Sequence, residues 1–311
     1  MKAAAADSAI HVVFAADANY APPLAVAMVS AARNCDPQRK LIFHVLQYGI
    51  TGALRDRVEK SIAMARVPNA RVDWLDAPVE RIDKFSLAHR YTTALTFARL
   101  LLPEMMPPEV EKVIYLDCDL VVNGDLAKLW DTDIADKALG AVRDISGFVS
   151  EPDGVVNYAQ LGIPADAPYF NAGVLVMNLA KWRDADIGAK VIAHLSKYQD
   201  IIRMADQEAL NAVLWNDWRE LAYGWNWQIL HRDYRSGKLD PVWTPMETSK
   251  DIIHFTTGEK PWRPDCDYSE KAYYFRYLDQ TDWRGMRPSG LQELRARFKR
   301  MLQGLVNHFR K

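Results

Sequence analysis

Short apolar runs alternate with longer amphipathic stretches along most of this chain, and the two patterns predict different elements. Runs that are rich in β-branched residues and bounded by turn-forming residues are typical of strands buried on both faces of a mostly parallel sheet. On this basis we predict strands at Ile10–Ala16, Lys40–Gln47, Arg71–Leu75, Lys112–Leu116, Leu139–Asp144, Val174–Asn178 and Ile252–Phe255.

The amphipathic stretches between these strands show helical periodicity. They predict helices at Pro22–Arg33, Thr51–Ala65, Arg90–Leu102, Asp125–Trp130 and Asp186–Tyr198. Pro103 is expected to stop the third helix, and Ala205–Leu210 is expected to be a polar loop that runs into another helix. The segment Ile145–Pro168, which is rich in Gly and Pro, suits a long loop. Alternating strands and helices predict an α/β fold, with a Rossmann-like, mostly parallel central sheet flanked by helices.

Composition limits the class of protein without naming a function. With 311 residues, of which 49% are hydrophobic, the chain can form one large α/β domain or two modest ones. The net charge of −1 does not suggest a nucleic-acid partner. Cys35, Cys118 and Cys266 are odd in number and widely spaced, which argues against disulfides and for a reducing compartment. No stretch resembles a signal peptide or a membrane span, so we expect a cytoplasmic protein.

The strand that starts at Lys112 leads into Asp117-Cys118-Asp119. Ligands of open α/β sheets bind at the carboxyl ends of the strands, and two adjacent buried carboxylates are costly unless a positive group joins them. A divalent cation that also holds a diphosphate meets this need; the alternative is a solvated turn. His254, at the end of a predicted strand, would complete a set suited to Mn²⁺, although a lone His is more often structural.

Polar residues also follow the first predicted strand. Asp17 could accept a hydrogen bond from a nucleotide base and Asn19 could contact a ribose, or either residue could simply cap the next helix. The chain has no G-x-G-x-x-G motif after this strand, so a dinucleotide site is not expected. Arg99 lies in an apolar helix face, where it would either pair with an Asp or reach an anionic ligand.

Five further residues could contact a sugar or a phosphate. Asn171 can both donate and accept hydrogen bonds, and Ala172 with Gly173 allows close approach of the backbone. Asp144 ends another predicted strand, and Lys260 could neutralise a phosphate.

Six ordered blocks between Ile10 and Trp262 resemble glycosyltransferase family 8, in particular the bacterial lipopolysaccharide and lipooligosaccharide galactosyl- and glucosyltransferases. The blocks are Phe14-Ala15-Ala16-Asp17-x-Asn19-Tyr20, Phe97-Ala98-Arg99-Leu100, Tyr115-Leu116-Asp117-Cys118-Asp119, Phe170-Asn171-Ala172-Gly173-Val174, Asp206-Gln207, and His254-Phe255 followed after four residues by Lys260-Pro261-Trp262. The resemblance implies a GT-A fold, a UDP-hexose donor, a requirement for Mn²⁺ with Mg²⁺ as an alternative, and retention of the anomeric configuration.

The same resemblance implies a role for each matched residue. The metal ligands would be Asp117, Asp119 and His254. The donor would be bound by Ala15, Asp17, Asn19, Arg99, Cys118, Asn171, Ala172, Gly173, Gly258 and Lys260. Asp144, Asp206 and Gln207 would lie at the reacting sugars. The chain departs from the family at Thr257, where a glycine is usual; Gly258 follows it. Because an amide is a poor nucleophile, we favour front-face attack, with Gln207 shielding the cationic sugar.

The last part of the sequence predicts a basic amphipathic helix rather than more of the sheet. We therefore divide the chain into a GT-A domain over residues 1–265 and a tail over residues 266–311. Ser289 and Gln292 form a capping-box pattern. Apolar residues then recur at helical spacing: Leu291, Leu294, Phe298, Met301, Leu302, Leu305, Val306 and Phe309. From Arg284 to Lys311 there are eight Lys or Arg against one Glu. Such a basic amphipathic helix favours an anionic membrane surface at the inner face of the cytoplasmic membrane, or else packs on the body.

The expected function is therefore transfer of galactose or glucose from a UDP-sugar to a saccharide acceptor, with a lipid-linked saccharide as the favoured acceptor. Two alternatives within this framework are a self-glucosylating protein of the glycogenin type and an inactive sugar-nucleotide-binding protein. A nucleotidyltransferase would normally carry a Gly-rich phosphate loop after its first strand, and Asp17–Pro23 has none. The pattern of residues does not choose between galactose and glucose.

Overall fold

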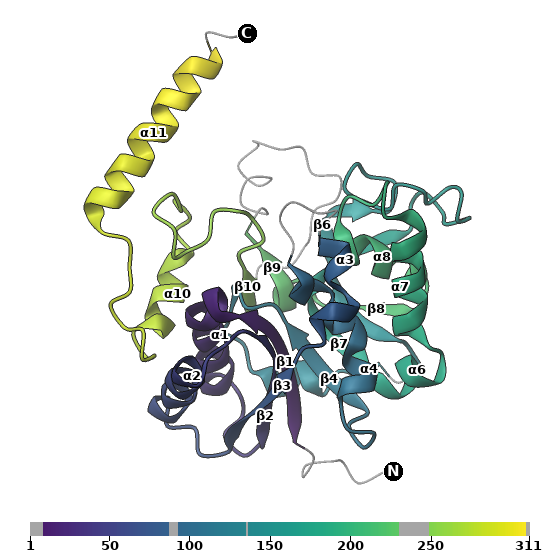
Figure 1. Cartoon of the computed structure of the whole chain (residues 1–311), viewed down its shortest axis with the longest axis horizontal. Helices are drawn as coiled ribbons and strands as arrows, with labels where there is room; N and C mark the ends of the chain where they lie inside the picture. The colour runs from purple at the N-terminus through teal and green to yellow at the C-terminus, as the bar shows by residue number, and fades with distance from the viewer. Residues whose placement is uncertain (1–8, 87–92, 135, 230–248, 309–311) are drawn as a thin grey trace.

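The computed structural model describes residues 9–86, 93–134, 136–229 and 249–308 (Figure 1). Its strands form two sheets. The larger sheet has the order β3-β2-β1-β4-β7-β6-β8, with bounds β1 Ile10–Asp17, β2 Leu41–Tyr48, β3 Ala70–Asp76, β4 Lys112–Leu116, β6 Leu139–Phe148, β7 Pro168–Asn178 and β8 Trp218–Glu220. The smaller sheet has the order β5-β10-β9, with bounds β5 Leu120–Val122, β9 Trp227–Gln228 and β10 Ile252–His254.

The larger sheet is parallel across its first four strands, β3, β2, β1 and β4. Strand β7 then runs antiparallel to both β4 and β6, and β8 is parallel to β6. The predicted mostly parallel central sheet is therefore confirmed. It also brings the carboxyl ends of β1 and β4 to the same edge, where Asp17 and Asp117 lie.

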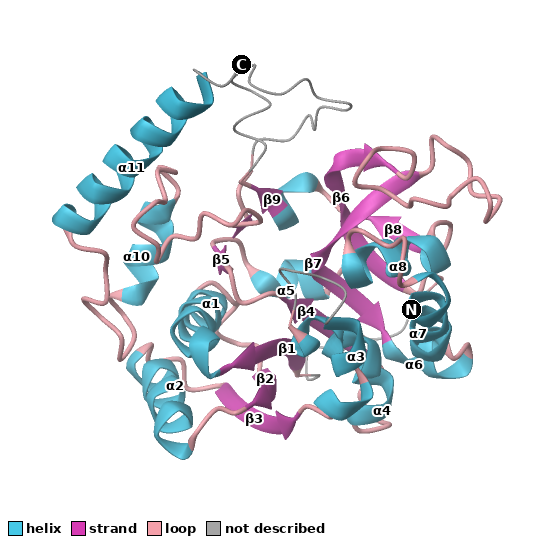
Figure 2. Ribbon diagram, turned by 45° about the horizontal axis from the view of Figure 1, so that its top comes forward, coloured by secondary structure: helices cyan, strands magenta, loops and turns pink. Residues whose placement is uncertain are grey.

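Helices cover both faces of this sheet (Figure 2). On one face lie α1 Ala21–Arg33, α2 Gly52–Met64, α5 Leu126–Trp130 and α10 Lys271–Leu278. On the other face lie α3 Asp83–Ser86, α4 Leu102–Met105, α6 Leu179–Asp184, α7 Ile187–Tyr198 and α8 Ala205–Leu214. The described residues also form short 3₁₀ segments: η1 Ala18–Tyr20, η2 Val79–Arg81, η3 Ala94–Leu101 and η4 Tyr223–Asn226.

Alternation along the central strands explains why the molecule has two cores. In β1, Val12 and Phe14 face one core while Val13 faces the other. In β7, Val174 faces the first core and Leu175 the second. Strands buried on both faces need apolar residues at every position, which is why these runs could be recognised in the sequence.

Four predicted boundaries are wrong. The strand expected at Val174–Asn178 already begins at Pro168, the first residue of β7. The first residues of the helix expected at Arg90–Leu102 lie outside the described residues; the described part is η3, which begins at Ala94 and passes into α4 at Leu102. Pro103 does not stop it, because proline in the first turn of α4 lacks only an N–H that has no helical partner there. Ala205–Leu210 is the start of α8 rather than a loop. The first residues of the expected long loop, Ile145 to Phe148, extend β6 instead.

The C-terminal helix α11, Gly290–His308, extends away from the rest of the molecule (Figure 1). The predicted capping box is present, with the Ser289 N–H donating to Gln292 Oε1 at 2.7 Å and the Gln292 N–H donating to Ser289 Oγ at 3.3 Å. Its apolar side chains are exposed where they are described: Leu291, Leu294, Phe298, Met301 and Leu302. Phe309 lies outside the described residues. Among the described helices, none is both long enough and apolar enough to span a membrane.

Candidate active site

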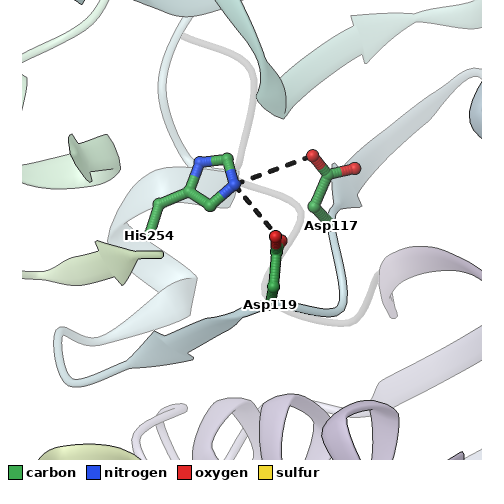
Figure 3. A group of neighbouring side chains, drawn as sticks. All are labelled: Asp117, Asp119 and His254. Carbon is green, nitrogen blue, oxygen red and sulfur yellow. Dashed lines mark ion pairs between the residues drawn. The ribbon is translucent and has the colours of Figure 1, made fainter. Parts of the chain in front are cut away.

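Two aspartates and a histidine meet where the two sheets join (Figure 3). Asp117 directly follows β4 of the larger sheet, Asp119 directly precedes β5 of the smaller sheet, and His254 ends β10. His254 Nε2 lies 3.3 Å from Asp119 Oδ1 and 3.7 Å from Asp117 Oδ2. The antiparallel pairing of β10 with β5 places His254 opposite Leu120, next to Asp119.

The donor atoms of this cluster fit a divalent cation. One ligand atom from each of Asp117, Asp119 and His254 lies within 4.8 Å of the others. Carboxylate oxygens together with one imidazole nitrogen are donors that Mn²⁺ accepts, and carboxylates also suit Mg²⁺. The three predicted metal ligands are thus brought together by β4 and β5, which are neighbours in the sequence, and by β10, which lies far along the chain.

Arg99, from η3, pairs with carboxylates beside this cluster. Its Nη2 donates to Asp117 Oδ1 at 3.0 Å, and its Nε lies 3.0 Å from Asp206 Oδ2. Arg99 also donates to the Ala172 carbonyl and lies over the ring of Tyr115. Of the two options left open for this residue, pairing with Asp is the one observed. Burial raises the pKa of Asp206 to about 6, and the positive charge of Arg99 only partly counteracts it.

Lys260 approaches the cluster from the loop after β10. Its ammonium group contacts Asp119 Oδ2 and the carbonyl oxygen of Phe255. Burial alone would raise the pKa of Asp119, but the positive charge of Lys260 holds it well below its ordinary value. Asp119 is therefore ionised and available to a cation at neutral pH. Gly258, on the same loop, faces open space, since an added Cβ would have no neighbour within 4 Å.

A second group of polar side chains lies on the side of β7 and α8. Asn171 Nδ2 donates to Asp144 Oδ2 at 2.9 Å, and Gln207 Nε2 reaches the same oxygen at 3.3 Å. Gln207 Oε1 accepts from the Ala172 N–H at 3.0 Å. Asp144, Asn171, Ala172 and Gln207 are thus brought together in one hydrogen-bonded group.

Gly173 permits the close approach of β7 to the cluster. Its carbonyl accepts a hydrogen bond from the Asp117 N–H at 2.9 Å. A Cβ at this position would lie 2.2 Å from His254 Cε1 and 2.8 Å from Asp117 Oδ2. Only glycine fits this position without displacing the histidine.

The turn after β1 lies beside the Asp-Cys-Asp segment. Asp17 Oδ1 accepts from the N–H groups of Asn19 and Tyr20, so its predicted capping role is observed, at η1. Cys118 Sγ contacts the Ala15 carbonyl at 3.3 Å, and burial raises the pKa of this thiol well above its usual range. The turn and the Asp117–Asp119–His254 cluster therefore belong to one site.

Sequence reasoning missed two residues of this site. Asn226 is fully buried, and its Oδ1 lies 2.9 Å from His254 Nδ1. The Tyr115 hydroxyl donates to Asp117 Oδ1 at 3.2 Å. Tyr115 stands two residues before Asp117 on an apolar strand, where a buried hydroxyl must find a partner, so this contact could have been suspected. Asn226 lies in an aromatic stretch of the sequence, where nothing indicates that it lies near a metal ligand.

This mixed sheet, with a pair of carboxylates between its two parts and a histidine facing them, defines an α/β fold of the GT-A glycosyltransferase class. The chain matches the glycosyl transferase family 8 model over residues 11–266 and belongs to that family. The resemblance inferred from the six sequence blocks is confirmed.

Proteins of related sequence and structure agree with this assignment. The chain is 30% identical to general stress protein A of Bacillus subtilis over 288 residues, which covers 89% of this chain and 96% of that protein. It is 22% identical to the lipopolysaccharide 1,2-glucosyltransferase of Escherichia coli K12, covering 94% of this chain and 85% of that one. The crystal structure of the galactosyltransferase LgtC in complex with donor and acceptor sugar analogues matches with a TM-score of 0.76 and 31% identity, over 89% of this chain and 100% of that one.

Proposed function

We propose that this protein is a retaining hexosyltransferase that moves galactose or glucose from a UDP-sugar to a saccharide acceptor and uses Mn²⁺. The observation that carries the proposal is the Asp117–Asp119–His254 cluster at the strand ends, beside the turn that carries Asp17. This edge of an α/β sheet is where nucleotides bind. The similarity to LgtC, which binds donor and acceptor sugar analogues, supports it.

In this proposal the cation would be held by the cluster and would neutralise the diphosphate as it leaves. Lys260 already contacts Asp119 and would add a second positive charge to the diphosphate. Asp17 would accept from the uracil ring through the oxygen that does not cap η1, and Asn19 would contact the ribose. Ala15, Cys118 and Gly258 would complete the donor pocket.

Retention of configuration requires either a covalent intermediate or attack on the same face as the leaving group. The carboxylate of Asp206 is buried against Arg99, and Gln207 offers only an amide. Neither is a good nucleophile, so front-face attack is favoured. Gln207 would then shield the positive charge that develops on the sugar. Asp144, which is held by Asn171 and Gln207, would lie close to the reacting sugars.

The proposal is tested by incubating the protein with Mn²⁺ and a panel of UDP-sugars and measuring the release of UDP. Slow hydrolysis of UDP-galactose or UDP-glucose is expected, and Asp119→Asn should abolish it while the protein still melts cooperatively. Asp131→Asn, at an exposed ion pair with Arg39, is the matched control and should retain the activity. If no UDP-sugar is hydrolysed, or if Asp119→Asn is as active as the wild type, the proposal is wrong.

We further propose that residues 1–265 form the transferase domain and that α11, in the tail over residues 266–311, holds it on an anionic membrane, at the inner face of the cytoplasmic membrane, where the acceptor would be a lipid-linked saccharide. Helix α10, which belongs to the same tail, packs on the core of the domain. The basic character of the tail and the exposed apolar side chains of α11 support this arrangement. The similarity to a lipopolysaccharide glucosyltransferase suggests the same class of acceptor.

Vesicle flotation tests the membrane proposal. The full chain should float with vesicles that contain phosphatidylglycerol and should remain in solution with phosphatidylcholine alone. A chain ending at Arg287 should not float with either. Leu294→Glu combined with Phe298→Glu removes the exposed apolar contacts and should have the same effect. Equal flotation of all these proteins would contradict the proposal.

A further inference from the structure

A continuous chain of hydrogen bonds joins Asp144 to His254 through two buried asparagines. Asn171 Nδ2 donates to Asp144 Oδ2 at 2.9 Å, and Asn171 Oδ1 accepts from the Gly173 N–H at 2.9 Å. Asn226 Nδ2 donates to Asn171 Oδ1 at 2.8 Å, and Asn226 Oδ1 lies 2.9 Å from His254 Nδ1. Each side chain in this chain is at most 8% exposed, so water does not compete for these contacts.

The direction of every bond in this chain follows from one backbone group. The N–H of Gly173 can only donate, so the atom of Asn171 that faces it must be the carbonyl oxygen. This oxygen also faces Asn226, which must therefore present its NH₂ group to it. The remaining atom of Asn226, its oxygen, then faces His254 Nδ1. Only a protonated Nδ1 can bond to that oxygen, so the proton of the neutral imidazole belongs on Nδ1.

This tautomer determines what the other ring nitrogen of His254, Nε2, presents to the two aspartates. With the proton on Nδ1, His254 Nε2 presents a lone pair toward Asp119 Oδ1 at 3.3 Å and Asp117 Oδ2 at 3.7 Å. Three electron-rich atoms then face one another, which is the arrangement that a cation requires. Histidines that bind metals usually donate their second N–H to a neighbouring acceptor, which fixes both the ring orientation and the tautomer.

We propose that Asn226 is a positioning residue that holds His254 in the Nδ1–H tautomer and thereby prepares Nε2 to bind the divalent cation. This inference rests on the metal site of the proposed function. Asn226 reaches its place because β9, which follows it directly, pairs in parallel with β10 and sets Gln228 opposite His254. It touches neither the donor nor the acceptor sugar in this scheme and acts only through the histidine.

The competing explanation is that Asn226 merely fills space and satisfies neighbouring polar groups. The two explanations differ for substitutions of similar size. Asn226→Asp keeps an oxygen for His254 Nδ1 but loses the donor to Asn171, whereas Asn226→Leu loses both. A role through His254 predicts that Mn²⁺ affinity, measured by electron paramagnetic resonance of the free ion, falls about 10- to 100-fold in Asn226→Leu. Asn226→Asp should bind Mn²⁺ clearly more tightly than Asn226→Leu.

Asn34→Leu is the matched control. Asn34 is a half-buried amide, less buried than Asn226, and it donates to the Ser30 and Val122 carbonyls. Its loss should lower the melting temperature without changing the affinity for Mn²⁺. If Asn34→Leu and Asn226→Leu weaken Mn²⁺ binding equally, or if Asn226→Leu binds like the wild type, the inference is wrong. If the wild type itself binds no Mn²⁺, the proposed function fails instead.

A second measurement identifies the ligand nitrogen in the folded wild-type protein, with one variant used only to assign the signal. With ¹⁵N-labelled histidine and ¹¹³Cd²⁺ in place of Mn²⁺, the nitrogen that shows coupling to cadmium is the ligand. We expect this coupling at His254 Nε2 and a slowly exchanging proton on Nδ1, with the signal assigned by its absence in His254→Gln. Coupling at Nδ1, or rapid exchange of the Nδ1 proton, would overturn the inference.

Discussion

Arg99 forms an ion pair with one carboxylate oxygen of Asp117, Oδ1, so that only the other oxygen, Oδ2, faces His254. Arg99 Nη2 donates to Asp117 Oδ1, the oxygen that also accepts from the Tyr115 hydroxyl, while Oδ2 faces His254. A carboxylate held in this way cannot rotate to place both oxygens on a cation. The orientation of Asp117 is therefore fixed by Arg99, which is not itself part of the Asp-x-Asp motif.

We predict that Arg99→Met is strongly destabilising. It would leave the buried carboxylate of Asp206 without its partner, and breaking a buried ion pair in this way typically costs about 3–5 kcal/mol. Urea denaturation followed by tryptophan fluorescence measures the loss. The matched control is Arg81→Met, at the exposed pair with Glu104, which should cost less than about 1 kcal/mol. Similar losses of unfolding free energy in both variants would show that the buried Arg99 pair stabilises the protein no more than an exposed pair does.

Gly173→Ala should damage the metal site more than the fold. The new methyl group would lie within 2.2 Å of His254 Cε1, so the imidazole must move away from the two aspartates. We expect the affinity for Mn²⁺ to fall at least tenfold, with a loss of stability of about 1–3 kcal/mol from overpacking. Calorimetric titration measures the affinity. Gly52→Ala, where an added Cβ meets nothing within 4 Å, should bind Mn²⁺ normally; unchanged affinity in Gly173→Ala would contradict the geometry.

His44 is expected to make the protein less stable in mild acid. Burial, reinforced by the neighbouring His11 and Arg71 and opposed by Asp73, lowers the pKa of His44 to about 4. The unfolded chain, with an ordinary pKa near 6.5, therefore binds more protons between these values. The loss of unfolding free energy caused by His44 is absent above about pH 6.5 and grows to about 3 kcal/mol by about pH 4.

The difference between wild type and His44→Gln isolates this effect from the other titrating groups. Urea denaturation at a series of pH values should show the wild type losing more stability than His44→Gln as the pH falls from about 6.5 to 4. Parallel stability curves for the two proteins would rule out His44 as the cause.

Ala205 adopts a left-handed conformation, with φ of 50°, at the start of α8. This conformation costs an L-residue about 1–2 kcal/mol, and glycine avoids most of that cost. Ala205→Gly should therefore be neutral or up to about 1 kcal/mol more stable in thermal unfolding. Ala212→Gly, inside the same helix, should instead lose about 1 kcal/mol. The same sign of change in both variants would contradict the assigned backbone strain.

Much of this architecture could be predicted because local chemistry determines it. Strands β1 and β4 are apolar on both faces, so their sequences differ visibly from their surroundings. The Ser289–Gln292 capping box depends on residues three positions apart and was found as predicted. The segment before Pro103 was harder, because a 3₁₀ helix and an α-helix share nearly the same apolar spacing.

What could not be predicted from the residues alone depends on contacts between distant segments. Asn226 meets His254 only because two very short strands, β9 and β10, pair in parallel. Arg99 meets Asp206 across more than a hundred residues, so pairing could be expected but not the partner. A metal-binding role for Asp117 and Asp119, in contrast, was suggested both by two carboxylates at the end of a buried strand and by their place within the six blocks.

The position of Asp117 and Asp119 has a practical consequence. Asp117 directly follows a strand of the seven-stranded sheet and Asp119 directly precedes a strand of the three-stranded sheet, so an ion bound by both would cross-link the two halves of the architecture. Binding to the native state alone raises the unfolding free energy by about 2.7 kcal/mol at a ligand concentration one hundred times Kd. Differential scanning fluorimetry could therefore rank metals, nucleotides and sugar nucleotides before any glycan substrate is in hand.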